Sequence, residues 1–155
     1  MYGPLTTLRL ASPAFEDGER IPREYGYTEA NVNPPLEFAG VPEEAASLAL
    51  VIDDPDAVEP AGQVWDHWVV WNVDPTTDRI HADWAPGDAV EGTNDYGERG
   101  YGGPNPPDGE HTYRFRLFAL SEAPDLPPGA TKADLEEAMA GRILAEAELT
   151  GTYAP

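Results

Sequence analysis

The segment Val64–Val73 (VWDHWVVWNV) decides the fold prediction, because bulky apolar residues stand at both odd and even positions of a β-branched and aromatic run. A strand with this pattern is covered on both of its faces. Two other segments also predict buried strands. Ser47–Ile52 (SLALVI) is a continuous apolar run, and His111–Leu120 (HTYRFRLFAL) begins by alternating apolar and basic residues. A weaker strand is expected at Leu5–Leu10.

Turn-forming residues connect these strands without a linker that would divide the chain. The 155 residues include 17 Pro and 15 Gly, which is too many for a helix bundle. One helix is predicted after Thr131, which resembles the start of a capping box with Asp134. Apolar residues then keep helical spacing at Leu135, Ala138, Met139 and Ile143. The helix is expected to end at Gly141 or to run to about Ala147, followed by a short extended tail at Leu149–Tyr153. The residues therefore predict one mostly antiparallel β domain, 1–155, with a C-terminal helix.

The charge of the chain argues against a nucleic-acid partner. There are 29 acidic residues against 9 basic ones, so the formal net charge is −20, and Lys132 is the only lysine. Neutralising phosphates requires a basic face. The acids are dispersed and the aromatic content is 10%, so the chain is expected to fold rather than form an acidic tail. An acidic protein of this kind fits a halophilic setting of concentrated salt; the alternative is a cationic partner.

Several classes of protein are excluded or disfavoured by what the sequence lacks. Cysteine is absent, which excludes disulfides, thiolate metal sites and a cysteine nucleophile. No apolar run is long enough for a membrane span, and no signal peptide is recognised, so a cytoplasmic protein is expected. There is no Gly-x-Ser-x-Gly elbow and no phosphate-binding Gly-Lys loop. We therefore expect a protein that is not an enzyme and has no catalytic residues and no cofactor.

A candidate site can be assembled at the ends of the three buried strands. Asp54 and Asp56 follow the first strand in a turn, and His67 lies inside the second. His111 and Tyr113 begin the third strand and point to one face if it is regular. A carboxylate near an imidazole favours its charged form. We therefore expect both histidines to be imidazolium groups that donate to an anion, with Tyr113 as a further donor.

A glycine-rich loop precedes the third strand and contributes to the same candidate site. Gly102 and Gly103 allow the backbone to approach a ligand, and successive amides in such a loop can form an anion-binding nest. Together these groups predict a small pocket for a phosphate or carboxylate headgroup.

Other interpretations of the same residues stay open. His67 alone could be a hydrogen-bonded structural residue. Asp54, His67 and His111 are also the side chains of a mononuclear metal site, which would make the protein a metal-dependent enzyme. A third hypothesis is a protein-interaction module in which the pocket takes a partner's acidic side chain. Self-association as a homodimer is compatible with the sequence.

The order of these segments resembles the phosphatidylethanolamine-binding protein family, in particular its prokaryotic Raf-kinase-inhibitor-like (YbhB/YbcL) branch. The blocks that carry the resemblance are SPAFEDGERIPREY (Ser12–Tyr25), NPPLEFAGVPEEAASLALVIDDPDA (Asn33–Ala57), DHWVVWNV (Asp66–Val73), GTNDYGERGYGGPNPPDGEHTYRFRLFAL (Gly92–Leu120) and GRILAEAELTGTY (Gly141–Tyr153). The resemblance implies a central antiparallel sheet with a smaller second sheet. It also implies an anion-binding pocket and, in some members, regulation of another protein.

The family's pocket residues fall on particular positions of this chain. The resemblance places its acidic turn on Asp54 and Asp56, its histidines on His67 and His111, and its tyrosine on Tyr113. The loop positions fall near Gly102, Gly103, Pro106 and Pro107. The resemblance also implies a cis Asp54–Pro55 bond.

The chain departs from the family pattern at three positions. Val58 replaces a proline, Asn105 replaces a cysteine, and Asp66 replaces a second histidine. The last change adds negative charge near the pocket and puts a preference for phospholipid in doubt.

Overall fold

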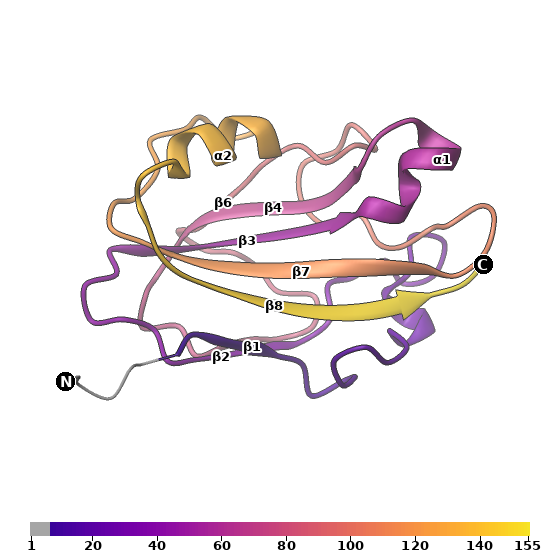
Figure 1. Cartoon of the computed structure of the whole chain (residues 1–155), viewed down its shortest axis with the longest axis horizontal. Helices are drawn as coiled ribbons and strands as arrows, with labels where there is room; N and C mark the ends of the chain where they lie inside the picture. The colour runs from indigo at the N-terminus through magenta and orange to yellow at the C-terminus, as the bar shows by residue number, and fades with distance from the viewer. Residues whose placement is uncertain (1–6) are drawn as a thin grey trace.

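The computed structural model describes residues 7–155, in which a five-stranded antiparallel sheet forms the centre of the molecule (Figure 1). Its strand order is β6-β4-β3-β7-β8. The strands are β3 (Ser47–Asp54), β4 (Trp65–Val73), β6 (Val90–Glu91), β7 (His111–Leu120) and β8 (Ile143–Tyr153). All eight residues of β3 are buried, because the strand has a neighbour on each edge and apolar cover on each face. The three strands expected to be buried are confirmed.

A smaller antiparallel sheet packs against one face of the central sheet. Its order is β1-β2-β5, with β1 at Arg9–Ala11, β2 at Leu36–Ala39 and β5 at Arg79–Ile80. Leu10 and Phe38 from this sheet share one buried cluster with residues such as Leu50 and Phe115 of the central sheet. The main core therefore lies between the two sheets. The predicted strand Leu5–Leu10 is found only from Arg9 onward, and residues 5 and 6 lie outside the described part.

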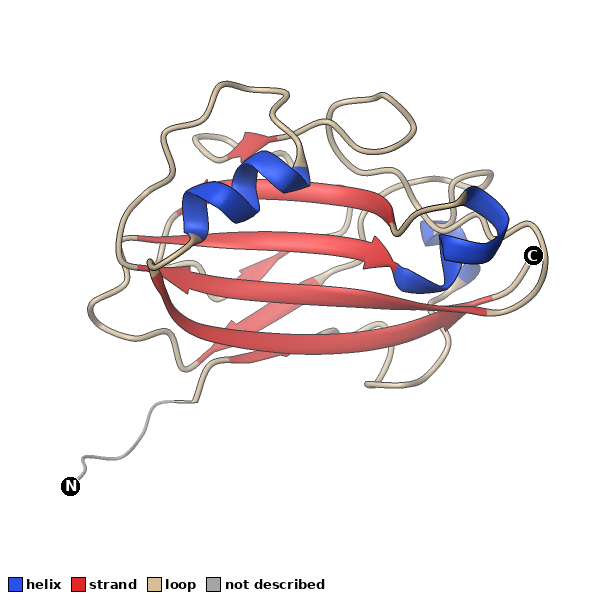
Figure 2. Cartoon of the chain, turned by 45° about the horizontal axis from the view of Figure 1, so that its top comes forward, coloured by secondary structure: helices blue, strands red, loops and turns tan. Residues whose placement is uncertain are grey.

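The opposite face of the central sheet is covered by α2 (Lys132–Met139), so the molecule has three layers (Figures 1 and 2). Leu135 and Met139 of α2 are buried against Val51 and Trp71. The predicted capping box is present: the Thr131 hydroxyl accepts from the Asp134 amide at 3.3 Å, and the Asp134 carboxylate accepts from the Thr131 amide at 3.0 Å. No helix within residues 7–155 is long and apolar enough to cross a membrane.

The C-terminal prediction requires a correction. The helix ends at Met139, so Ile143, which keeps helical spacing, is not helical but begins β8. Gly141 has φ +78°, a left-handed conformation that glycine adopts at low cost, and there the chain reverses. The extended segment is eleven residues long because β8 pairs with β7 along its whole length, from Ile143 opposite Leu120 to Tyr153 opposite His111.

Two short helical segments follow β3 and bring its acidic end beside β7. A 3₁₀ turn at Pro55–Ala57 leads directly into α1 (Val58–Ala61), and a further 3₁₀ turn lies at Arg23–Tyr25. Asp54 caps the first turn by accepting a 2.8 Å hydrogen bond from the Asp56 amide. The Asp54–Pro55 peptide bond is trans, contrary to expectation. Asp54 is extended, the conformation favoured before a proline, and Pro55 suits the first position of a helical turn.

Candidate ligand-binding site

A cavity of about 220 Å³ opens where β3 ends and where β4 and β7 begin. Its polar and aromatic lining comes from Asp54, Trp65, His67, Tyr96, His111 and Tyr113. Strands β4 and β7 flank β3, so the predicted site residues of all three strands meet at one end of the sheet. The structure thus brings together Asp54, both histidines and Tyr113, as the sequence predicted.

Apart from Asn105, the rest of the cavity wall is apolar. Ala57, Pro60 and Ala61 come from the turn and helix after β3, while Pro106 and Pro107 come from the loop before β7. Pro106 is therefore a wall residue. A small cavity with apolar walls and a few convergent polar groups is the usual form of a ligand site.

His111 lies between two carboxylates. Its Nδ1 donates to Asp54 Oδ2 at 2.6 Å, and its Nε2 donates to Asp108 Oδ1 at 2.7 Å. Burial by itself lowers the pKa of His111, but the hydrogen bonds to Asp54 and Asp108 outweigh it and raise the pKa above its ordinary value. His111 is therefore an imidazolium with both N–H groups already donated. The sequence interpretation missed Asp108, although its position three residues before His111 was a signal.

His67 is in a different state from His111. Its ring is buried, and Nδ1 lies 2.7 Å from the Gly102 carbonyl oxygen, so Nδ1 carries the proton. Burial lowers the pKa of His67, and the nearby Gly102 carbonyl and Asp54 charge offset this only in part. The expectation of two imidazolium groups is therefore replaced by one charged and one neutral histidine.

Gly102 and Gly103 hold the side chains of the site and do not themselves line the cavity. The Gly102 amide donates to the His67 carbonyl at 2.9 Å, and the Gly103 amide donates to Asn31 Oδ1 at 2.8 Å. The Gly103 carbonyl accepts a 2.8 Å hydrogen bond from the Tyr96 hydroxyl. Because both amides have partners inside the protein, the predicted anion-binding nest is not formed in this structure.

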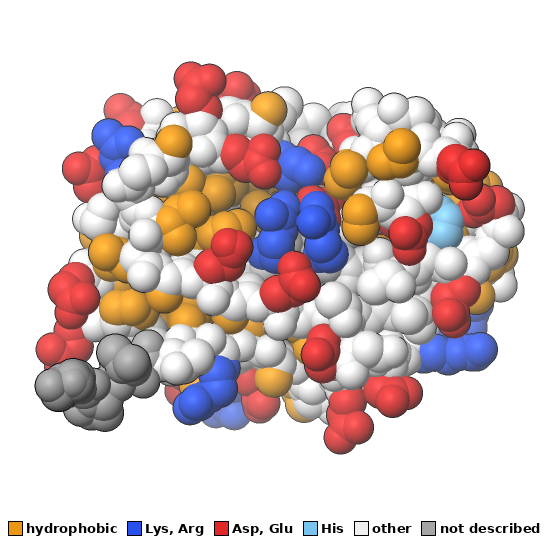
Figure 3. All heavy atoms as spheres, viewed as in Figure 1, with side chains coloured by type: hydrophobic (Ala, Val, Ile, Leu, Met, Phe, Trp, Pro, Cys, Tyr) orange, Lys and Arg blue, Asp and Glu red, His pale blue; other side chains and the backbone are white. Residues whose placement is uncertain are grey.

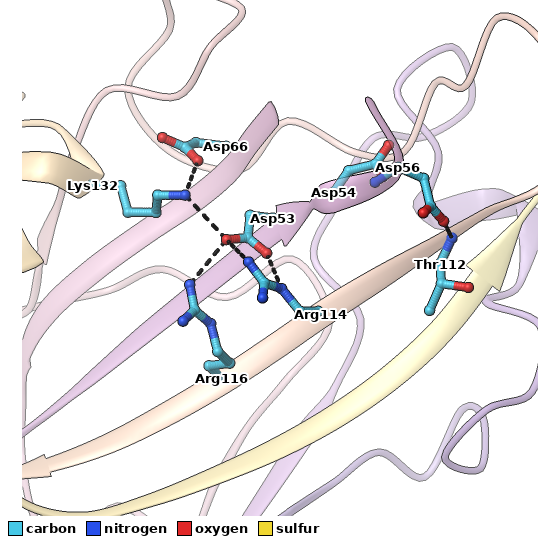
Figure 4. A network of polar contacts seen from close by, with 8 residues as sticks. All are labelled: Asp53, Asp54, Asp56, Asp66, Thr112, Arg114, Arg116 and Lys132. Atoms are coloured by element: carbon cyan, nitrogen blue, oxygen red, sulfur yellow. Dashed lines mark hydrogen bonds and ion pairs between the residues drawn. The ribbon is translucent and has the colours of Figure 1, made fainter. Parts of the chain in front are cut away.

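Asp56 also lies outside the cavity lining. Its carboxylate accepts a 2.9 Å hydrogen bond from the Thr112 amide, which ties the turn after β3 to the start of β7 (Figure 4). Asp56 therefore stabilises the corner that carries Asp54 and His111.

Two hydrogen-bond donors in the cavity wall have no partner among residues 7–155. They are the indole N–H of Trp65 and the hydroxyl of Tyr113, both fully buried. Burial and the charge of Asp54 raise the pKa of Tyr113 far above its ordinary value, so the hydroxyl keeps its proton. A buried donor without a partner costs about 1–3 kcal/mol, so both groups favour an acceptor in the cavity. The sequence analysis did not reveal this role for the Trp65 N–H.

Asp53 points to the opposite face from Asp54, as successive residues of a strand do. Its fully buried carboxylate binds Arg114 at 2.8 Å, Arg116 at 2.9 Å and Lys132 at 3.1 Å, and Lys132 also lies 2.7 Å from Asp66 (Figure 4). Burial by itself raises the pKa of Asp53, but the three cations outweigh it and lower the pKa. Figure 3 shows a cluster of basic side chains bordered by acidic ones on this face of the molecule. The cluster fixes the end of β3 from behind the cavity.

The metal-site hypothesis gains no geometric support. Within the described part of the chain, no three or more carboxylate or histidine side chains are placed to hold a metal ion. Both nitrogens of His111 already face carboxylates, and Nδ1 of His67 faces a carbonyl.

Comparison with known proteins identifies the family. Residues 11–154 match the profile described as "Phosphatidylethanolamine-binding protein". A "UPF0098 protein" of Methanothermobacter thermautotrophicus is 47% identical over 151 residues, covering 94% of this chain and 98% of the relative. A phosphatidylethanolamine-binding protein homologue of Chlamydia trachomatis, CT736, superposes with a TM-score of 0.89 at 42% identity, covering 96% and 97% of the two chains. YbcL of E. coli, described as a member of the mammalian PEBP family, superposes with a TM-score of 0.86 at 30% identity. This match covers 94% of this chain and 97% of YbcL. The chain therefore belongs to the phosphatidylethanolamine-binding protein family.

Proposed function

We propose that this protein binds a small oxyanion, a phosphoryl or carboxylate headgroup, in the cavity at the end of β3. The observation that carries the proposal is the pair of unpartnered donors, Trp65 Nε1–H and Tyr113 O–H, in the wall of one cavity. Oxygen atoms of a ligand would accept from both and remove the cost of burying them without partners. The imidazolium of His111 at the same cavity carries a positive charge, which the bonded carboxylates of Asp54 and Asp108 offset.

The size and surroundings of the cavity support a headgroup rather than a large molecule. A volume of about 220 Å³ lies below the roughly 300–1,000 Å³ of sites for drug-sized ligands. The formal charge of −20 opposes an anion, but exposed charges are largely screened beyond about 10 Å at 0.1 M salt. The unpartnered donors in the cavity wall therefore matter more for binding than the distant acidic residues do.

In this proposal the protein is a binding protein without a catalytic step or a resident cofactor, acting in the cytoplasm. A regulatory role, as an inhibitor of another protein, is a second candidate. It is favoured by Val58, which is 51% exposed on α1. Pro60 and Ala61 of the same helix line the cavity. An apolar rim beside a cavity that holds a few polar groups would suit a partner's acidic or phosphorylated side chain.

The test is an NMR titration of the tryptophan indole N–H signals with inorganic phosphate and, separately, with acetate. We expect the Trp65 signal to shift saturably. The Trp68 signal serves as the control, because Trp68 Nε1–H already donates to Glu91 at 2.7 Å. Tyr113→Phe should weaken binding, whereas Tyr101→Phe should not, because the Tyr101 hydroxyl donates to the Tyr25 carbonyl instead. A Trp65 signal that stays in place at millimolar concentrations of both anions would refute the proposal.

A further inference from the structure

His67 presents a hydrogen-bond acceptor, not a donor, to the cavity. Its Nδ1 proton is donated to the Gly102 carbonyl, and the residue is 2% exposed. In a neutral imidazole the other nitrogen carries a lone pair. Nε2 has no hydrogen bond to any described residue, and His67 lines the cavity. The carbonyl of Gly102 thus fixes the tautomer that makes Nε2 an acceptor.

The groups around His67 do not supply a proton to that nitrogen. From the loop before β7, the Tyr96 hydroxyl donates to the Gly103 carbonyl. From β7, His111 donates both of its N–H groups to carboxylates, and Tyr113 makes no hydrogen bond within residues 7–155. From β3, Asp54 adds only acceptor oxygens. The rings of His67 and Tyr113 pack in a T-shaped arrangement, with centroids 5.2 Å apart.

The charges at the site also favour a ligand that donates a hydrogen bond to His67. The single imidazolium of His111 is bonded to two carboxylates, Asp54 and Asp108. These three groups sum to a net charge of −1, from one positive and two negative charges. A ligand oxygen that offers only lone pairs to Nε2 and to Asp54 would be repelled, whereas a ligand hydroxyl would donate to Nε2.

From this arrangement we propose that the cavity selects oxyacids that still carry a proton, such as phosphomonoester monoanions, and rejects oxyanions without an O–H group. His67 is the specificity-determining residue, because its Nε2 accepts from the ligand's P–O–H group. Trp65 and Tyr113 donate to the ligand's other oxygens. The inference rests on the proposed function and narrows its ligands to those that keep a proton, so an ionised carboxylate such as acetate is expected to bind more weakly than a phosphomonoester monoanion.

The test separates the ligand's charge from its proton. Methyl phosphate as the monoanion and dimethyl phosphate both carry a charge of −1, but only methyl phosphate has a P–O–H group. Near pH 6, the approximate second pKa of a phosphomonoester, we expect methyl phosphate to bind at least about tenfold more tightly than dimethyl phosphate or sulfate, a ratio worth about 1.4 kcal/mol. Affinity for methyl phosphate should then fall as pH rises, because the ligand loses its proton.

Two variants distinguish selection for a protonated ligand from anion binding in general. Tyr113→Phe should weaken the binding of methyl phosphate and of dimethyl phosphate alike, so the ratio of the two affinities should stay unchanged. His67→Phe should bring the ratio close to one. The comparison of ligands in the unmodified protein does not depend on how well either variant folds.

The possible outcomes test this inference separately from the proposed anion-binding function. If dimethyl phosphate and sulfate bind as tightly as methyl phosphate, the inference is overturned and anion binding stands. If none of the three binds, the proposed function itself fails.

A phosphomonoester could be a free metabolite or the headgroup of a lipid, so a separate experiment uses vesicles that contain phosphatidic acid. Binding to these vesicles that methyl phosphate displaces would assign the source to a lipid; binding of methyl phosphate alone would assign it to a soluble molecule.

Discussion

Asp54 and His111 join the end of β3 to the start of β7 through a 2.6 Å hydrogen bond between two side chains that are 4% and 5% exposed. Asp108, on the other side of the same ring, is 53% exposed. The two carboxylates make similar contacts in different surroundings. Because a buried charge is screened less than an exposed one, Asp54 should have the larger effect on the charge of His111.

The first prediction is therefore that Asp54→Asn lowers the pKa of His111 more than Asp108→Asn does. Each variant removes one of the two carboxylates that raise this pKa. Histidine side-chain NMR over a pH series measures it directly. Glu110→Gln, which removes an exposed acid two residues from Asp108, is the matched control and should leave the pKa of His111 nearly unchanged. Equal shifts from all three variants would mean that general charge, not hydrogen bonding, controls His111.

The two histidines should affect the pH dependence of stability in opposite ways. The pKa of His111 is raised by folding, so its contribution is present below the unfolded value of about 6.5 and is lost as pH rises through the folded value. The pKa of His67 is lowered by folding, so protonation of the unfolded chain below about pH 6.5 favours unfolding. Urea unfolding across this range should show that Asp54→Asn removes stability mainly at the acidic end.

Replacing Asp53 should lower the free energy of unfolding more than replacing most other carboxylates does. Breaking a buried ion pair by removing one partner typically costs about 3–5 kcal/mol, and Asp53 is fully buried with three cationic partners. We expect Asp53→Asn to lower the free energy of unfolding by an amount in that range. Asp125→Asn, at an exposed position, is the control and should change stability little.

The pH dependence of the Asp53 contribution gives a second measurement. Folding lowers the pKa of Asp53, so its stabilising effect is present above the unfolded value of about 3.9 and is lost as pH falls through the folded value. The native protein and Asp53→Asn should therefore converge in stability at strongly acidic pH. A constant difference between them at all pH values would contradict the assigned charge.

The sequence predicted the position of the site better than its chemistry. Asp54, His67 and His111 could be placed together because each lies near the end of a recognisable buried strand, and those strands are neighbours. The protonation states could not be predicted, because they depend on Asp108 and on the Gly102 carbonyl, which the loop brings into contact only in the folded chain.

The C-terminal strand shows the same limitation in the fold. Ile143 keeps the helical spacing of Leu135 and Met139, so local pattern alone extends the helix. Gly141 ends that pattern, and pairing with β7 decides the conformation of β8. Such pairing joins residues distant in sequence, and no local propensity records it.

The loop glycines are predicted to be required for close packing rather than for amide donation. A Cβ atom at Gly103 would lie 2.1 Å from the Tyr25 backbone oxygen, and one at Gly102 would lie 2.5 Å from the Tyr96 ring. Gly103→Ala should therefore destabilise the protein strongly, since backbone cannot move aside easily. Gly102→Ala should displace the Tyr96 ring and alter the cavity wall. Its main effect should therefore be weaker binding of methyl phosphate, with a smaller loss of stability.

Thermal unfolding and ligand titration of both glycine variants check this contrast. Gly18→Ala is the control for backbone strain alone, because Gly18 has φ +83° and a Cβ atom added there would have no neighbour within 4 Å. If Gly103→Ala is as stable as the unmodified protein but no longer binds anions, the amide-donor interpretation from the sequence would be restored.

The last prediction concerns salt. The chain carries a formal charge of −20 with only 9 basic residues, and three of those, Arg114, Arg116 and Lys132, are bound to Asp53. Few cations remain to balance the exposed acids, so self-repulsion should destabilise the folded state at low ionic strength. The Debye length falls from about 10 Å at 0.1 M salt to about 3 Å at 1 M, so the melting temperature should rise with KCl over that range. Asp53→Asn should show the same rise, because the buried cluster is screened little. A melting temperature that stays constant or falls with KCl would show that the acids are spaced without net repulsion, and the halophilic interpretation of the composition would then fail.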